Sequence, residues 1–203
     1  MCVVIIVESE HIPAMCASIT QAIHERKPFA MTPYVRRQCL PSRFRTPQEF
    51  FDAVGARVLT TEGNPRYCPL PKHEILMPPV EWLGLETWQS CLCHEFLHLS
   101  EVVYRWHEPS WKTELRAEIG QSVVEVLVGL PPCSDHTNII KWFGRWEQEI
   151  TADPHLAMTA TSSAIEGVKY LIKRACFEQS PEQKETEAAL MEMFETAKRE
   201  LAG

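Results

Sequence analysis

The chain lacks the two features that would assign it to a membrane or nucleic-acid-binding class. None of its apolar runs approaches the ~20 residues that a membrane-spanning helix needs. Its basic residues occur singly or in short pairs such as Arg36 and Arg37, and the formal net charge is −7. A protein that binds nucleic acid normally needs a concentrated basic patch to neutralise phosphates. We therefore expect no membrane insertion and no direct nucleic-acid binding.

Signals for export and for other enzyme classes are also lacking. The apolar run at residues 2–7 is too short for a signal-peptide core, has no basic flank and meets Glu8 at once. The eight cysteines include no CxxC pair, which favours reduced thiols over a disulfide framework. There is no glycine-rich phosphate loop and no GxSxG elbow. These absences predict a cytoplasmic protein that is neither a P-loop enzyme nor a serine hydrolase of the α/β type.

The composition is that of a globular protein with one well-filled core. Hydrophobic residues make up 45% and charged residues 23% of the 203 positions, which are ordinary values for soluble domains. Short β-type runs at 57–60, 66–68 and 74–77 are separated by Gly, Asn and Pro, and helical patterns follow at 85–104, 113–128, 137–150 and 156–177. The predicted fold class is α+β, with a small antiparallel sheet and a mainly helical body centred on the helix at 85–104.

Three segments are expected along the chain. Residues 1–45 form an N-terminal extension of uncertain structure, with a possible strand at 3–7 and a possible helix at 14–25. Residues 46–177 form the main domain, which opens with a short helix that has Thr46 as its N-cap, Pro47 at its first position and Gly55 after its end. Residues 178–203 form a charged amphipathic helix, which could pack against another copy of the chain.

The stretch "CHEFLH" carries the chemistry of the chain. His94 and His98 are four residues apart, so a helix places both imidazoles on one face, within reach of one ion. Neutral imidazole is a good Zn²⁺ ligand. Glu95 is rotated by about 100° from His94, where it can contact a water on the ion rather than the ion itself. Two ligands and one proton-accepting carboxylate are what an H-E-x-x-H hydrolase requires. An amphipathic helix with two histidines at its core edge would have the same pattern.

A catalytic zinc needs a third protein ligand. Tyr104 and Glu101 occupy the positions where one subclass has its third histidine and a glycine, which excludes that subclass. A glutamate from the next helix, as in gluzincin-type sites, is the alternative. We favour Glu118, because Ala117 and Gly120 beside it allow close helix packing. Glu114, one turn earlier on the same side, is the competing candidate, and Glu125 is a weaker one.

Further residues have both a functional and a structural interpretation. Cys91 lies on the face of the histidines and is either a soft metal contact or a small buried thiol. Groups that could stabilise an oxyanion or bind substrate are Tyr67, His73, Tyr104 and His107. Asp135 and His136 could orient a ligand histidine, although an N-cap at Ser134 or Asp135 explains the same stretch.

The ordered set "GARV", "GNPRYCP", "EILMPP", "CHEFLH", "ELRAEIG" and "SSAIEGVKYL" resembles the zincin-like metallopeptidase domain of ArdC-type antirestriction proteins, which occur on plasmids, phages and other mobile elements. The similarity spans roughly residues 47–173. It implies His94, His98 and Glu118 as metal ligands and Glu95 as the catalytic carboxylate. Residues 1–45 are too short for the single-stranded-DNA-binding domain of that family. Trp111 stands where the family tends to have a tyrosine.

These observations predict a zinc-dependent metallopeptidase-like hydrolase that acts in antirestriction or interference with host defence. Its expected substrate is a protein or peptide, and host defence or DNA-processing proteins are its expected partners. The alternative is a non-catalytic factor that binds host proteins and keeps a structural or vestigial metal site, because an acidic chain suits a basic, DNA-binding surface. A third reading is a helical scaffold without metal.

Overall fold

The computed structural model describes residues 6–36, 44–69, 72–104, 109–132 and 139–176. The elements follow one another along the chain as a 3₁₀ turn η1 (Ser9–His11), α1 (Ile12–Glu25), α2 (Pro47–Val54), β1 (Arg57–Thr60), β2 (Arg66–Cys68), β3 (Glu74–Met77), α3 (Val80–Leu83), α4 (Leu85–Tyr104), α5 (Ser110–Val128), α6 (Ile140–Ala152) and α7 (His155–Cys176). This content confirms the predicted α+β class.

Local sequence signals explain most of these boundaries. All three strands and α4 have the predicted ends. Thr46 caps α2 by accepting from the Glu49 backbone N–H, while the Glu49 carboxylate accepts from the Thr46 backbone N–H, and Gly55 ends the helix in the left-handed conformation. α5 begins three residues before the predicted start, because Pro109 can stand before a first helical turn without losing a hydrogen bond.

The predicted all-antiparallel sheet was wrong in one of its two pairings. β3 lies between the other strands, antiparallel to β2 but parallel to β1. The reason is burial: Ile75 and Met77 of β3 are buried, whereas β1 is almost entirely exposed. The most apolar strand takes the middle position, which separates β1 from β2 and leaves β1 at an edge.

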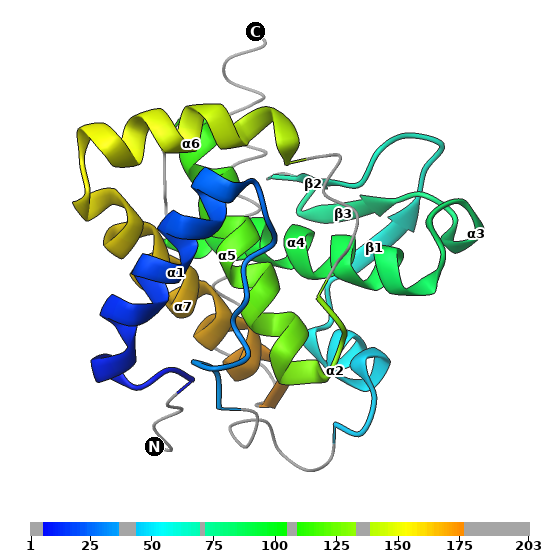
Figure 1. The fold of residues 1–203 in the computed structure, drawn as a ribbon. Coiled ribbons are helices and arrows are strands. Elements are labelled where there is room, and N and C mark those ends of the chain that lie inside the picture. Colours follow the sequence, from blue (N-terminus) through cyan, green and yellow to red (C-terminus); the bar gives the residue numbers. More distant parts are fainter. Residues whose placement is uncertain (1–5, 37–43, 70–71, 105–108, 133–138, 177–203) are drawn as a thin grey trace, which may run out of the picture.

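The helical body surrounds α5 (Figure 1). α5 packs against α4, α6 and α7, while α1 and α2 pack on α7. Twelve residues of α5 are buried, and they include Arg116, Glu118, Gln121 and Glu125 among the apolar ones. α4 contacts β2 and β3 as well as α5 and α7, so the HExxH helix joins the sheet to the helical body.

Two of the predicted segments can be located only in part. The helix expected at 14–25 is α1, and it packs on α6 and α7. Of the possible strand at 3–7, residues 6 and 7 form a bend and the rest lies outside the described residues, as does the C-terminal helix expected at 178–203. The division of the chain at residues 45 and 177 stays a prediction.

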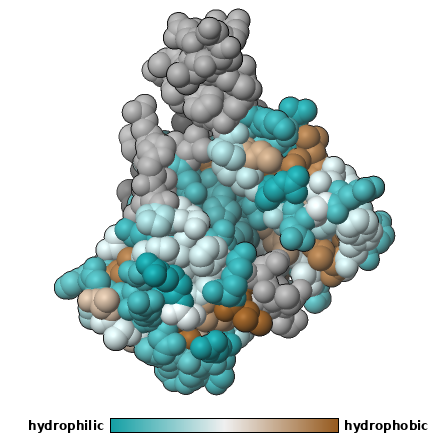
Figure 2. Space-filling model, turned by 90° about the horizontal axis from the view of Figure 1, so that it is seen from above, coloured by the Kyte–Doolittle hydropathy of each residue, from teal (hydrophilic) through white to brown (hydrophobic). Residues whose placement is uncertain are grey.

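The surface carries mostly hydrophilic side chains on the face seen in Figure 2, with hydrophobic residues in small separate patches. Within the described ranges, no helix is both long and apolar enough to cross a membrane.

Candidate metal centre

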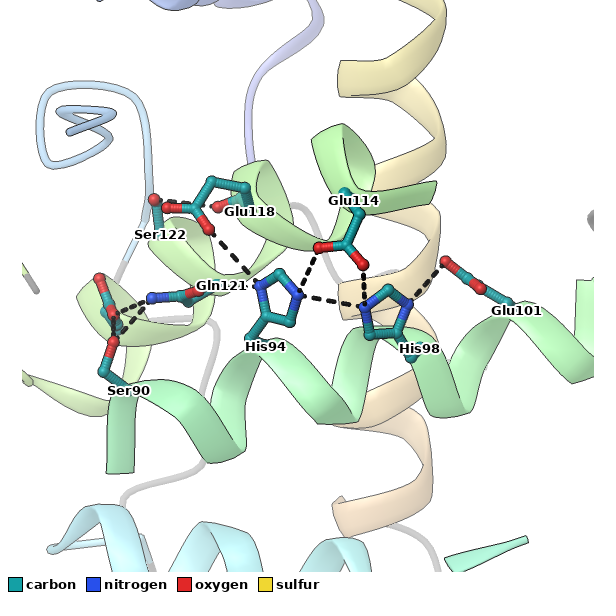
Figure 3. A network of polar contacts seen from close by, with 9 residues as sticks. Ser90, His94, His98, Glu101, Glu114, Glu118, Gln121 and Ser122 are labelled. Carbon is teal, nitrogen blue, oxygen red and sulfur yellow. Dashed lines mark hydrogen bonds and ion pairs between the residues drawn. The ribbon is translucent and has the colours of Figure 1, made fainter. Parts of the chain in front are cut away.

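The candidate site lies along the contact between α4 and α5. Polar residues recur at helical spacing on both facing surfaces: Ser90, His94, His98 and Glu101 on α4, and Glu114, Glu118, Gln121 and Glu125 on α5. We call these eight residues the polar seam (Figure 3). The helices approach closely beside it, because a Cβ on Gly120 would lie 2.4 Å from Cδ1 of Leu97. The sequence-based expectation of close packing at Gly120 is thus confirmed.

Three side chains of the seam direct their ligand atoms at one point. The Nε2 atoms of His94 and His98 lie 3.1 Å apart. Glu114 places Oε2 at 3.4 Å from Nε2 of His94 and Oε1 at 3.8 Å from Nε2 of His98. His94, His98 and Glu114 can each offer one ligand atom such that all three atoms lie within 4.8 Å of one another.

These separations fit a divalent ion. Two nitrogens bound tetrahedrally to Zn²⁺ at ~2.0–2.1 Å are about 3.3 Å apart, and the observed nitrogen pair is at 3.1 Å. The nitrogen–oxygen separations of 3.4 and 3.8 Å are close to the same value. The donor set of two imidazoles and one carboxylate is also one that zinc accepts in catalytic sites.

The other ring nitrogens are held from behind. Nδ1 of His98 lies 3.1 Å from Oε1 of Glu101, and Arg116 approaches the same oxygen at 3.6 Å. Nδ1 of His94 lies 3.1 Å from Oε1 of Gln121 and 3.5 Å from Oε2 of Glu118. Because these partners are oxygen acceptors, they favour the tautomer of each neutral ring in which Nδ1 carries the proton and Nε2 has the lone pair.

Glu114 and Glu118 therefore occupy different places around His94. Glu114, the competing candidate from the sequence, lies beside Nε2 of both histidines, and 28% of its side chain is exposed. Glu118, the favoured candidate, lies at Nδ1 of His94 and is 6% exposed. Both are one turn apart on α5. Glu125 lies farther along the seam, where it accepts from Ser90 and Gln121.

The charge of the cluster attracts cations. Burial lowers the pKa of His94, but its hydrogen bonds to Glu114 and Glu118 and the charge of Glu95 prevail and hold that pKa well above the ordinary 6.5. Burial likewise raises the pKa of Glu114, but the hydrogen bond from His94 and the charges of His98 and Lys141 prevail and lower it below 4.5. A ring that readily accepts a proton among carboxylates is also a ring that readily accepts a metal ion.

Glu95, the predicted proton acceptor, is 94% shielded from solvent as a residue, with a relative exposure of 6%. Among the described residues it forms no hydrogen bond or ion pair with another side chain, and its charge acts on His94.

The remaining predicted residues lie elsewhere or outside the described part. The hydroxyl of Tyr67 and Nδ1 of His73 are 2.7 Å apart, and Tyr104 donates to the Glu166 carbonyl oxygen. Cys91 packs against the hydrophobic core. The carbonyl oxygen of Trp111 accepts from the Trp146 indole. His107, Asp135 and His136 lie outside the described residues.

The sequence did not lead us to predict Ser90 and Gln121 as site residues, and Glu125 was considered only as a ligand. The spacing of polar residues in α5 could have indicated the common face of Gln121 and Glu125. In α5 the polar positions 114, 118, 121 and 125 follow a 4-3-4 spacing inside a segment that is otherwise largely apolar, and such spacing marks one face of a helix.

A cavity of about 520 Å³ lies on the sheet side of α4. It is lined by Val58, Leu59, Thr60, Met77, Pro78, Pro79, Val80, Glu81 and Trp88. None of these residues belongs to the polar seam, so this cavity and the histidine cluster are separate features.

Comparisons with known proteins give structural similarity alone. No protein-family model and no curated protein matches the chain. The Mn(II)-bound crystal structure of the antirestriction protein ArdC from plasmid R388 is similar, with a TM-score of 0.59 and 26% identity over 66% of this chain and 53% of that one. The metal-free structure of ArdC matches with a TM-score of 0.56 and 24% identity over 68% and 56%. The chain thus spans about half the length of ArdC, and the likeness supports an ArdC-like relationship.

Proposed function

We propose that the chain is a zinc-dependent metallopeptidase-like hydrolase of zincin type that acts in antirestriction or interference with host defence. The observation that carries the proposal is the convergence of two Nε2 atoms and the Glu114 carboxylate, on a helix that also carries the buried Glu95. An H-E-x-x-H helix with a carboxylate from the following helix is the donor set of a hydrolytic zinc site.

In this proposal His94, His98 and Glu114 hold the ion. Glu118 was the ligand favoured from the sequence; its carboxylate lies at Nδ1 of His94, so we assign it the role of orienting that ring. A carboxylate behind a ligand imidazole fixes the ring orientation and makes the ligand more basic. The two assignments for Glu118 differ in how much affinity its removal should cost.

The chemistry follows from the division of labour in the cluster. Zn²⁺ bound there would supply Lewis-acid polarisation of a carbonyl group and a bound water whose pKa is near ~7. Glu95 would accept a proton from that water and deliver it to the leaving amine. Glu101 and Arg116 would keep the His98 ring in place during both steps.

The biological setting is proposed from the similarity to ArdC, whose structures are described as those of an antirestriction protein. ArdC has been solved both with Mn(II) and without metal. Protein or peptide substrates, and partners among host defence proteins, follow from the same proposal.

A non-catalytic factor that binds host proteins is the second candidate, and the net charge of −7 favours it. An acidic surface can occupy a basic DNA-binding surface of a partner. The two candidates differ at Glu95, because binding of a partner does not require a proton acceptor beside the histidines.

The experiment compares wild type, Glu95→Gln and the control Glu86→Gln, an exposed glutamate in the first turn of the same helix. Zinc content is measured by elemental analysis after gel filtration. Cleavage is measured on unfolded casein and on a fluorescence-quenched peptide library. We expect one zinc per chain in all three proteins and a loss of cleavage of about 10²–10⁴-fold in Glu95→Gln alone. Zinc binding without cleavage by wild type would favour the binding factor, and absence of zinc would remove the proposal.

A further inference from the structure

Behind His94 the polar seam continues into the protein interior as a chain of hydrogen bonds. Oε1 of Gln121 lies 3.1 Å from Nδ1 of His94, and Nε2 of Gln121 donates to Oε1 of Glu125 at 2.9 Å and to Oγ of Ser90 at 2.7 Å. Ser90 donates in turn to the same Glu125 oxygen at 2.5 Å. Ser90, Gln121 and Glu125 are all buried, so water does not substitute for these bonds.

The direction of each bond is set by the carboxylate at the inner end. Oε1 of Glu125 accepts from both Ser90 and Gln121, so the amide nitrogen of Gln121 faces it. The amide oxygen must then face His94, and the only group that satisfies it is a protonated Nδ1. A flipped amide would place its oxygen against Glu125 and its NH₂ group against Nδ1, which leaves two mismatched pairs in a buried site.

We propose that Gln121, held by Glu125 and Ser90, is a positioning residue that keeps His94 in the Nδ1–H tautomer and so leaves Nε2 open to a metal ion. The proposal rests on the proposed metal site for its use, but the tautomer itself is a property of the metal-free protein. Glu118 also accepts from Nδ1, at a longer distance of 3.5 Å. Unlike the Glu118 carboxylate, the Gln121 amide can present only its oxygen to Nδ1, because its nitrogen is held by Glu125 and Ser90.

The variant Glu125→Gln tests this most sharply, since it keeps the shape and does not contact His94. An amide at position 125 can present its NH₂ group to Gln121, which allows the Gln121 amide to flip and His94 to adopt the other tautomer. Gln121→Leu removes the acceptor outright. Gln89→Leu is the matched control, because Gln89 is a glutamine of α4 that is as buried as Gln121, and no bond joins it to the described part of the seam.

Three measurements are made on each full-length protein. Long-range ¹H–¹⁵N NMR of the metal-free protein, at a pH where the imidazoles are neutral, reports which nitrogen of His94 carries the proton. Competition with a chromophoric chelator at fixed pH and salt gives the Zn²⁺ dissociation constant. Thermal unfolding of the metal-free protein reports the fold.

We expect the Nδ1–H tautomer for His94 in wild type and Gln89→Leu, and a mixture of tautomers in Glu125→Gln. Zinc affinity should fall about 10–100-fold in Glu125→Gln and Gln121→Leu and stay unchanged in the control. An unchanged tautomer in both variants overturns the proposal, even if affinity falls together with thermal stability, because that result is a structural effect only.

Two further outcomes are decisive. If wild type binds no zinc but shows the Nδ1–H tautomer that Glu125→Gln disturbs, the proposed function fails while the positioning role stands. If Glu125→Gln does not fold, Ser90→Ala is read by the same NMR measurement. It removes one donor to Glu125 and one acceptor for Gln121, and an unchanged tautomer population in it and in Gln121→Leu overturns the proposal.

Discussion

The Nε2 atoms of His94 and His98 face each other at 3.1 Å, with the Glu114 carboxylate beside both. Both Nδ1 atoms have oxygen acceptors as partners, which favours a proton on Nδ1 and leaves the lone pair of each neutral ring on Nε2. Two imidazole lone pairs at this distance require a proton or a cation between them. The stability of the metal-free protein and the zinc affinity of the site should therefore both depend on pH.

The first prediction concerns the pH dependence of stability without metal. The folded pKa of His94 is raised above 6.5, so its contribution to folding is fully present below that pH and is lost as pH rises through the folded pKa. The lowered pKa of Glu114 gives a contribution that is present above 4.5 and is lost as pH falls through the folded value. Thermal unfolding in a chelator should show the advantage of wild type over His94→Gln shrinking as pH rises above 6.5.

With zinc present the trend should reverse. A proton on His94 competes with the ion, so zinc affinity should rise with pH over the same range. A wild-type advantage that stays constant from pH 6 to 9 in the chelator would contradict the proton-holding role of His94, because the range of about pH 6–9 brackets ordinary and raised imidazole values.

The second prediction separates the two glutamates of α5. Glu114→Ala removes a proposed ligand and should abolish stoichiometric zinc after gel filtration. Glu118→Ala removes a partner of Nδ1 and should weaken binding by about 10–100-fold, which is measurable by chelator competition but leaves zinc bound at micromolar excess. The reverse order of effects would restore Glu118 as the third ligand. Glu86→Ala, on the exposed first turn of α4, is the control.

The third prediction concerns the choice of metal. Two imidazoles and a carboxylate bind Zn²⁺ more tightly than Mn²⁺ in the general order of divalent metals, although the similar ArdC structure holds Mn(II). Titration of metal-free protein with each ion should give the smaller dissociation constant for Zn²⁺. Equal or tighter Mn²⁺ binding would indicate additional oxygen ligands beyond the three proposed here.

The fourth prediction tests the helix contact that sets the ligand spacing. Gly120→Ala would place a Cβ 2.4 Å from Cδ1 and 2.5 Å from Cγ of Leu97. Relief of that overlap requires the Leu97 side chain to move or α4 to separate from α5, so we expect a loss of about 1–3 kcal/mol in the free energy of unfolding. Weaker zinc binding should accompany it, since the ligands sit on both helices.

Gly144 provides the matched control for this substitution. It lies in α6 with no atom within 4 Å of an added Cβ, so Gly144→Ala should stabilise the helix by about 0.5–1 kcal/mol. Chemical denaturation measures both. If Gly120→Ala is as benign as Gly144→Ala, the two helices are not held at the distance that Gly120 permits.

Local signals in the sequence were enough to predict most of the elements. Thr46, Pro47 and Gly55 mark the ends of α2 through the backbone groups that they satisfy or cannot satisfy, and such effects act within a few residues. The pairing of β1 with β3 was not accessible in this way, because it depends on which strand is buried most by the assembled fold. The histidine pair could be predicted from residues 93–98, because the spacing of His94 and His98 lies within one helix.

The choice between Glu114 and Glu118 depends on a relation between two helices. Both glutamates share a face of α5, and a shift of α5 by one turn along α4 would bring Glu118 to the place beside Nε2 of His94 that Glu114 occupies. The sequence contains no signal for that offset. It does contain a signal for the distance between the helices, namely Gly120, since only a residue without a side chain fits against Leu97.

Two packed helices usually meet through apolar side chains such as leucine, whereas α4 and α5 meet through the eight residues of the polar seam. Replacement of a whole set of mutually paired buried polar groups by apolar residues of similar size is often neutral or stabilising, so joint replacement of the eight seam residues by leucine and methionine would give a protein at least as stable that cannot hold an ion. A lineage released from selection for the activity should therefore lose the seam first and keep the fold. Relatives whose α4 and α5 meet through leucine and methionine would be descendants that have lost the metal site and its activity. The residues at those eight positions would identify them from sequence alone.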